Sequence, residues 1–171
     1  MIRQLKRTRR RYILIDVDTQ KDFLLAKSHA CIRNHRRVLS RIRRIMAWAR
    51  VNHIPIISIC EVFSYNNTPL VNAILQTNPL YTNSNLYPHD PEGQKKIRYT
   101  LINNRVCFPA DGNTDLPRDI LRRYKQIILH KRCIDPFDEP RIDRLLSEVK
   151  ANEFILIGTC LEGAVSATAL G

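Results

Sequence analysis

The sequence lacks any apolar run near the roughly 20 residues that cross a bilayer, and none of its cysteines form a C-x-x-C pair. Its five cysteines are an odd number, which is typical of reduced thiols and argues against a disulfide framework or a structural zinc site. They lie at Cys31, Cys60, Cys107, Cys133 and Cys160. The basic N-terminus is followed by a strand pattern rather than a signal-peptide core. We therefore expect a cytoplasmic protein with no metal, no cofactor and no membrane partner.

What the sequence does contain is enough apolar material for one folded domain. Its 171 residues are 44% hydrophobic and 26% charged, with a net charge of +12. The positive charge is concentrated in residues 3–11 and 35–50, which predicts a basic tail at 1–11 and a single domain at 12–171. Nucleic acid is one candidate partner for such a surface. No aromatic residues alternate with these arginines, so a solvated helix face is the favoured interpretation.

The order of apolar segments indicates the fold class. Short apolar runs predict strands, and a stripe of apolar residues with helical spacing predicts each helix. Strands are expected at 12–17, 54–60, 126–131 and 154–157, and helices at 35–52, 116–124 and 139–150, with a further short helix at 69–76. Strands that alternate with helices favour a doubly wound α/β domain, with a mostly parallel sheet and helices on both faces.

In this architecture the functional crevice lies beyond the carboxyl ends of the strands, where several polar residues occur. Asp16 and Asp18 end the first strand, and their spacing of two predicts that they face the same side. The other strand ends carry Cys60 and Glu61, His130 and Lys131 with Cys133 and Asp135 after them, and Cys160 and Glu162. A carboxylate, a lysine and a thiol at this edge would form a cysteine-nucleophile site. Spacing alone favours the alternative that these residues cap helices and pair with one another.

The last predicted strand is followed by a sharp turn into a helix. Gly158 ends the strand, and the helix begins near Ala164. Such a turn presents a side chain at the helix N-terminus, where backbone N–H groups stabilise an oxyanion. A cysteine or serine would be the nucleophile there, and alanine has no reactive group.

Three motifs resemble the isochorismatase-like hydrolase family and occur in that family's order. Residues 17–23 (VDTQKDF) resemble its strand followed by D-x-Q-x-D-F, residues 130–137 (HKRCIDPF) its strand-end lysine and later phenylalanine, and residues 158–169 its elbow. The resemblance extends from about residue 10 to the end of the sequence. It implies an isochorismatase-like fold, a small-molecule ligand in the crevice and assembly into a homo-oligomer.

The resemblance also assigns roles to single residues. Asp18 matches the general base, Lys131 the catalytic lysine, and Ala164 the position of the nucleophilic cysteine. Leu161 replaces a threonine that follows an unusual cis peptide, here the bond after Cys160. The residues expected to contact the ligand are Phe23, Phe137, Leu161 and Gly163. The zinc pattern D-x-H of nicotinamidase-type members is absent after the second strand, so the resemblance implies no metal.

Three hypotheses of function follow. The first is a hydrolase of amide, imide or enol-ether bonds that uses another thiol, Cys160 first and Cys133 second. The second is a member that binds its ligand, or acts on it through Asp18 and Lys131 without a thiol. The third is binding of a polyanion by the basic surface. If a substitution created Ala164, the resemblance implies that the unsubstituted protein is an ordinary cysteine hydrolase.

Two expectations concern the outline of the domain. The irregular segment 61–110 is expected to form a lid and substrate wall, with contacts from His89, Asp90 and residues 94–96. Family members add a strand and a helix after the elbow helix, so the resemblance implies a shortened protein or a sequence that is part of a longer one. A partner or a further segment would then cover the edge of the last strand.

Overall fold

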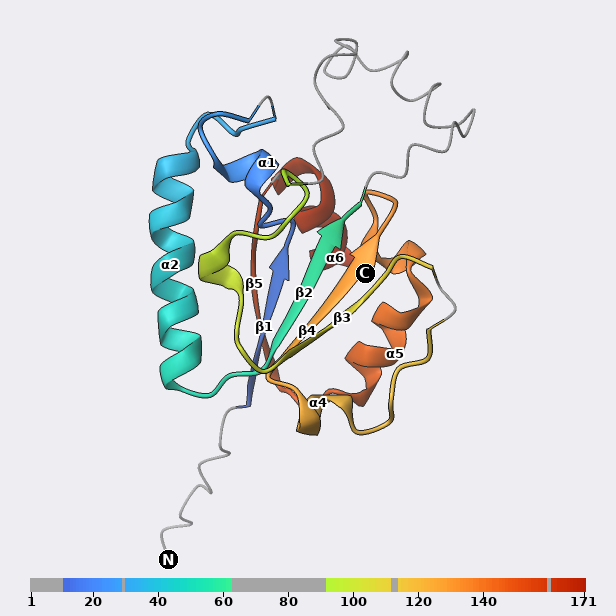
Figure 1. The fold of residues 1–171 in the computed structure, drawn as a ribbon. Helices are drawn as coiled ribbons and strands as arrows, with labels where there is room; N and C mark the ends of the chain where they lie inside the picture. Colours follow the sequence, from blue (N-terminus) through green and yellow to red (C-terminus); the bar gives the residue numbers. More distant parts are fainter. Residues whose placement is uncertain (1–10, 29, 63–91, 112–113, 160) are drawn as a thin grey trace, which may run out of the picture.

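A five-stranded parallel sheet forms the centre of the computed structural model, which describes residues 11–28, 30–62, 92–111, 114–159 and 161–171 (Figure 1). The strand order is β3-β4-β2-β1-β5, and all four pairings are parallel. The strands are β1 (Tyr12–Val17), β2 (Ile56–Glu61), β3 (Arg105–Phe108), β4 (Gln126–Lys131) and β5 (Glu153–Gly158). Their carboxyl ends therefore lie at one edge of the sheet.

Helices cover both faces of this sheet. The long helix α2 (His35–Val51) and the short α1 (Lys21–Leu24) lie over one face, whereas α5 (Pro140–Glu148) lies over the other (Figure 1). The remaining helical elements are α4 (Ile120–Arg123), α6 (Ser166–Leu170), the 3-10 turns Arg98–Thr100 and Pro136–Asp138, and a π-type turn at Leu161–Val165. The predicted doubly wound α/β fold is confirmed.

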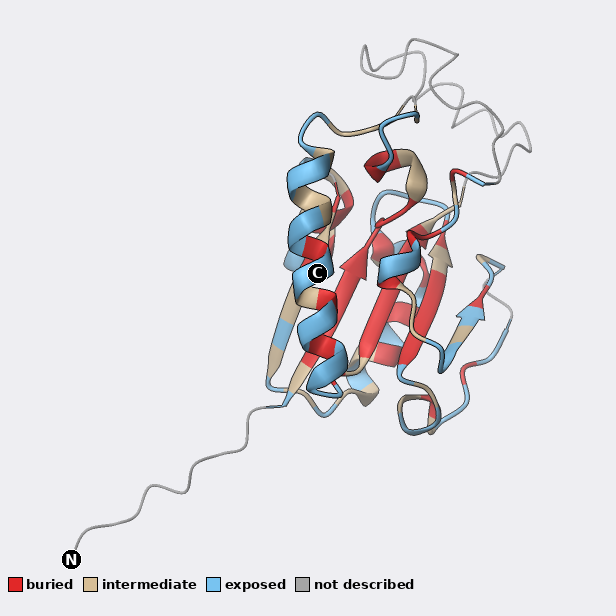
Figure 2. Cartoon of the chain, turned by 60° about the vertical axis from the view of Figure 1, so that its left-hand side comes forward, coloured by how far each residue is buried: buried red, intermediate tan, exposed pale blue. Residues whose placement is uncertain are grey.

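The apolar pattern explains this layering. One core cluster joins Ile15, Ile59 and Leu129 of the sheet to Ile142 of α5, and the second joins Leu14 to Met46 of α2. The strands β1, β2 and β4 are buried almost throughout, whereas α2 is buried on the side that faces the sheet and exposed on its outer side (Figure 2). Each fully buried aliphatic side chain contributes about 1.5–3 kcal/mol, so the two clusters are the main source of stability.

The predicted strands are confirmed to within two residues at each end, and β4 has the expected bounds. The fifth strand, β3, was not predicted, because Arg105 and Cys107 are exposed and only Val106 and Phe108 turn inward. The helix expected at 116–124 is shorter, Ile120–Arg123. The helix expected at 69–76 and residues 1–10 of the basic tail expected at 1–11 lie outside the described residues.

Two further observations concern the surroundings of the domain. Within the described ranges, β5 pairs only with β1 and is an edge strand, as expected for the last predicted strand. No helix in those ranges is both long and apolar enough to cross a bilayer.

Candidate functional site

Three charged side chains gather where the carboxyl ends of β1, β2 and β4 meet. Glu61 and Lys131 are register partners at the last positions of β2 and β4, and Asp18 follows the last residue of β1. The Lys131 ammonium lies 3.2 Å from the Asp18 carboxylate and 3.8 Å from that of Glu61. It also donates a hydrogen bond of 3.0 Å to the carbonyl of Cys133. One lysine therefore compensates two carboxylates.

Burial makes this pairing energetically important. The side chains of Lys131 and Asp18 are 1% and 4% exposed. A buried charge without a partner costs several kcal/mol, so loss of either residue is expected to destabilise the fold. The two sequence-predicted residues Asp18 and Lys131 are thus brought together.

The backbone at Asp18 has a left-handed conformation, with φ of 50°. Only a few per cent of residues other than glycine adopt it, and aspartate is among those that tolerate it best. Hydrogen bonds fix the residue on three sides: its N–H donates to Ile59, its carbonyl accepts from the Thr159 hydroxyl, and its carboxylate accepts from the Glu61 N–H. A strained conformation held by several contacts is typical of functional sites.

Asp16 and Asp18, whose spacing of two predicted that they face the same side of the strand, pair with different lysines. Asp16 lies within β1 and pairs with Lys96, whereas Asp18 lies beyond the strand and pairs with Lys131. The period of two holds only inside a strand, and the left-handed turn at Asp18 interrupts it. The two aspartates therefore have different surroundings.

Both site carboxyls bind protons more tightly than in water. Burial raises the pKa of Asp18, and the neighbouring Lys131 only partly offsets this effect. Burial likewise raises the pKa of Glu61 to about 7, against the attraction of Lys131 and with a contribution from the Asp18 charge. A carboxyl that stays protonated near neutral pH is able to act as a general acid.

The elbow after β5 carries no nucleophile at its expected position. Ala164 is 4% exposed and packs in the apolar cluster with Val165, inside the π-type turn. Ser166 and Thr168 direct their hydroxyls to the carbonyls of Leu161 and Ala164. Both hydroxyls therefore serve the local backbone.

The described thiols do not complete a cysteine site. Cys60 is buried, which raises its pKa to about 12, and the exposed Cys107 lies 3.6 Å from His130 Nδ1. Cys133 is exposed, and it meets Lys131 through its carbonyl rather than its sulfur. Among the hydrogen bonds of the described residues, none joins a thiol to Asp18 or Lys131. Cys160 and the peptide bond that follows it lie outside the described residues, so their roles stay predictions.

The expected ligand contacts have varied surroundings. Phe23 is buried in the α2-side core, Phe137 is half-buried against the other core, and Leu161 is 68% exposed. Gly163 is partly exposed and kinks the turn, with φ of −116° and ψ of −117°. These assignments remain predictions.

The expected substrate wall needs a correction at Lys96. Its side chain is 4% exposed and forms an ion pair of 2.6 Å with Asp16, so it is not available as an open ligand contact. Of its neighbours, Gln94 accepts a hydrogen bond from Gln20 through its carbonyl, and Lys95 pairs with Glu92. His89 and Asp90 lie outside the described residues.

The Lys96–Asp16 pair was missed at the sequence level, although one signal was present. A carboxylate within the apolar run of β1 requires a buried partner. Nothing in the spacing singles out Lys96 among 28 lysines and arginines, because it lies 80 positions away.

Two hollows on the described surface lie away from the site, since neither is lined by Asp18 or Lys131. One of about 330 Å³ lies between α2 and β5 and is lined by Val38, Ile45 and Ile157 among others. The other, about 460 Å³, lies beside Tyr99 and is lined by Lys21, Arg50 and Arg98. In the described part of the chain, no group of three or more His, Cys, Asp or Glu side chains is arranged to hold a metal ion.

Comparison with protein families gives one match. The model of the isochorismatase domain matches residues 12–171, which is most of the sequence. No curated protein matches the chain.

Solved structures share the fold at low identity. A cysteine hydrolase from Pseudomonas syringae pv. phaseolicola superposes with a TM-score of 0.64 at 18% identity, covering 92% of this chain and 63% of the other. An isochorismatase from Pseudomonas putida gives 0.59 at 17%, covering 93% and 61%. A pyrazinamidase/nicotinamidase from Streptococcus mutans gives 0.61 at 15%, covering 93% and 77%. The chain thus spans less than two thirds of the first two structures.

Proposed function

The chain belongs to the isochorismatase family, and on that premise we propose that it hydrolyses a small enol ether with Asp18 as the proton donor and without a thiol nucleophile. The observation that carries the proposal is the buried Asp18–Lys131 pair, whose carboxyl has a raised pKa, beside an elbow that holds Ala164. The match to a solved isochorismatase is consistent with this substrate class.

The chemistry of an enol ether suits these groups. The Asp18 carboxyl transfers its proton to the terminal vinyl carbon, and the ether oxygen stabilises the resulting oxocarbenium ion. Water adds to the oxocarbenium carbon and gives a hemiketal, which releases an alcohol and leaves a ketone. The proton lost by the water returns to the Asp18 carboxylate. Lys131 stabilises that carboxylate while it is charged, at 3.2 Å.

Amide or imide hydrolysis fits the site less well. The family route through an acyl intermediate requires a nucleophile, and alanine at position 164 does not supply one. Cys160 is the remaining thiol that could restore this route.

The experiment compares an alkyl vinyl ether carboxylate with a primary aromatic amide as probe substrates. Asp18→Asn should abolish turnover of the vinyl ether, whereas Cys160→Ser and the surface control Asp119→Asn should leave it unchanged. Loss of amide turnover in Cys160→Ser would instead establish a thiol hydrolase. Binding of either probe in calorimetry without turnover would establish a binding protein and refute the proposed catalysis.

A second candidate function is binding of a polyanion by α2. Its six arginines are exposed, the helix has no acidic residue, and within the described ranges none of the six forms an ion pair. They are Arg36, Arg37, Arg41, Arg43, Arg44 and Arg50. If nucleic acid is the partner, affinity for duplex DNA should fall steeply with salt, and glutamine at Arg37, Arg41 and Arg44 should reduce the slope. Binding that is independent of salt would exclude this function.

Self-association is proposed on separate grounds. β5 is a sheet edge in the described part of the chain, and its Phe154 side chain is 52% exposed. An edge strand that is uncovered and carries an exposed apolar side chain favours pairing with a strand of another molecule. Light scattering of the purified protein tests this, and a mass of one chain at all concentrations would contradict it.

A further inference from the structure

We propose that Lys96 is a positioning residue for Asp18. Its buried ion pair with Asp16 holds the segment 92–97 against the turn at residues 18–20. Because this segment is held in place, the Asp18 carboxylate stays in contact with Lys131. The inference rests on the proposed function only for the role of Asp18.

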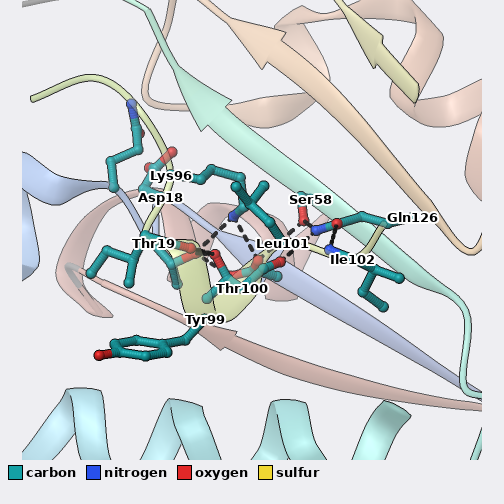
Figure 3. Close-up of polar contacts among 12 residues, drawn as sticks. Asp18, Thr19, Ser58, Lys96, Tyr99, Thr100, Leu101, Ile102 and Gln126 are labelled. Carbon is teal, nitrogen blue, oxygen red and sulfur yellow. Dashed lines mark hydrogen bonds and ion pairs between the residues drawn. The ribbon is translucent and has the colours of Figure 1, made fainter. Parts of the chain in front are cut away.

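The Lys96 ammonium, the Asp16 carboxylate and the Thr19 hydroxyl form a triangle of mutual contacts beside the turn at residues 18–20. Lys96 Nζ lies 2.6 Å from Asp16 Oδ2 and 2.7 Å from Thr19 Oγ1, and the Thr19 hydroxyl donates to Asp16 Oδ1 at 2.7 Å. The Lys96 and Asp16 side chains are 4% and 0% exposed. Figure 3 shows Lys96 reaching Thr19, which directly follows Asp18. The charged group is thus bonded to the residue next to the proposed acid.

The backbones of the two segments are joined as well. Gln20 and Lys96 form an antiparallel bridge, the Ile97 N–H donates to the Thr19 carbonyl, and the Lys21 N–H donates to the Lys95 carbonyl. Residues 19 and 21 therefore cannot move independently of residues 95–97. Asp18 therefore lies between β1 and a turn that is hydrogen-bonded to the segment 92–97.

The Gln20 side chain links the segment 92–97 to the end of β2. Its Nε2 donates to the carbonyls of Glu61 and Gln94 at 2.7 Å, and its Oε1 accepts from the Glu61 N–H at 3.0 Å. The same Glu61 N–H donates to Asp18 Oδ1 at 3.0 Å. The backbone of Glu61 thus contacts both the Asp18 carboxylate and Gln20, which is in turn bonded to the segment 92–97.

A buried network anchors the triangle to the sheet. The Ser58 hydroxyl donates to Asp16 Oδ2, and Gln126 Nε2 donates to Ser58 Oγ and to the Thr100 carbonyl (Figure 3). Among the described residues, no buried side-chain nitrogen or oxygen lacks a hydrogen-bond partner. A fully satisfied polar network in the interior rigidifies the elements that it joins.

This rigidity matters because Asp18 has a left-handed backbone. Such a conformation persists only when the surrounding structure determines it from several sides. Without the contacts of Lys96 to Asp16 and Thr19, residues 18–20 are free to relax, and the backbone of Asp18 can leave the left-handed region. The carboxylate then loses its bonds to the Glu61 N–H and to Lys131. A purely stabilising ion pair would have no such effect on Asp18.

The deciding variant is Asp16→Leu/Lys96→Met. Lys96→Met alone leaves a buried carboxylate unpaired and destabilises the whole fold, whereas apolar replacement of both partners is often close to neutral. Lys95→Met is the matched control, because it makes the same change one position earlier, at an exposed lysine paired with Glu92. If the double variant does not fold, Thr19→Val, which keeps both charges and removes the linking hydroxyl, is measured instead.

The readout is the Glu61 amide proton in nuclear magnetic resonance, because it reports the bond to Asp18 without turnover. In the folded double variant, its hydrogen exchange should accelerate at least ~10-fold, and its shift should no longer follow the titration of Asp18. The control should match the parent protein. Titration is interpreted against Lys131, Glu61 and Lys96, the groups that face Asp18.

An unchanged Glu61 amide in a folded double variant overturns the positioning role and leaves Lys96 as a stabilising residue. That outcome is distinct from failure of the proposed function. Absence of vinyl ether hydrolysis by the parent protein would refute the catalytic role of Asp18 and leave the positional readout intact.

Discussion

The Lys131 ammonium lies 3.2 Å from the Asp18 carboxylate, and both side chains are almost completely buried. The two residues are 113 positions apart in the sequence, and they lie at the ends of β1 and β4. Because a buried ion pair is weak as a source of stability, its presence at the carboxyl edge of the sheet favours a functional role.

Lys131→Met should destabilise the protein by about 3–5 kcal/mol, because it leaves the Asp18 carboxylate buried without its cation. Urea denaturation at neutral pH measures the change. Arg132→Met is the control, since Arg132 is exposed, and its effect should stay within about 0.5 kcal/mol. Equal stability of the two variants would show that Asp18 takes up a proton when the lysine is lost, as its raised pKa allows, or that another group compensates its charge.

Glu61→Gln should change how stability depends on pH. The pKa of Glu61 is raised from 4.5 to about 7, so the folded state binds more protons than the unfolded state between these values. The free energy of unfolding therefore falls as pH rises from 4.5 to 7, by at most about 3 kcal/mol from this group. The variant should lack this part of the fall in denaturation experiments at pH 5, 6, 7 and 8. An unchanged slope would contradict the raised pKa.

Asp18→Asn and Asp18→Ala should differ in stability although both remove the same charge. Asparagine tolerates the left-handed backbone at φ of 50°, and alanine costs about 1–2 kcal/mol more there. Thermal and chemical denaturation of the two variants measure the difference. If alanine were as stable as asparagine, the left-handed conformation would not be required in the folded protein.

Gly158→Ala should destabilise the elbow by about 1–3 kcal/mol through overpacking. A Cβ at this position would lie 2.5 Å from the Val17 carbonyl oxygen and 2.8 Å from a methyl carbon of Val165. The clash is with backbone, which cannot rotate away. Leu161→Ala, at an exposed position of the same elbow, is the control and should have little effect on the melting temperature. A neutral Gly158→Ala would mean that β1 and β5 separate locally.

Much of the fold was predictable because its core strands are buried on both faces. The runs at 12–17 and 126–131 are almost wholly apolar, and a parallel sheet needs such runs. β3 was missed because it is short and its Arg105 and Cys107 are exposed, so its pattern resembles a loop. Pairing with β4, a contact between distant segments, makes it a strand.

The candidate site was predictable only in part. Asp18 and Lys131 follow strands whose ends must meet, so topology alone brings them near each other. Glu61 was also expected at this edge because it ends the second strand, but its raised pKa was not predictable, since it depends on burial beside Lys131 and Asp18. Lys96 gave none either, because it lies in an irregular segment with many other basic residues.

The sequence by itself determined the doubly wound α/β class, the positions of the four buried strands and the alanine at position 164, because residue type and apolar periodicity are local properties. The tertiary structure decided which lysine neutralises which carboxylate. Asp16 pairs with Lys96 and Asp18 with Lys131, since a buried charge requires its partner within a few ångströms and chain folding alone selects that partner.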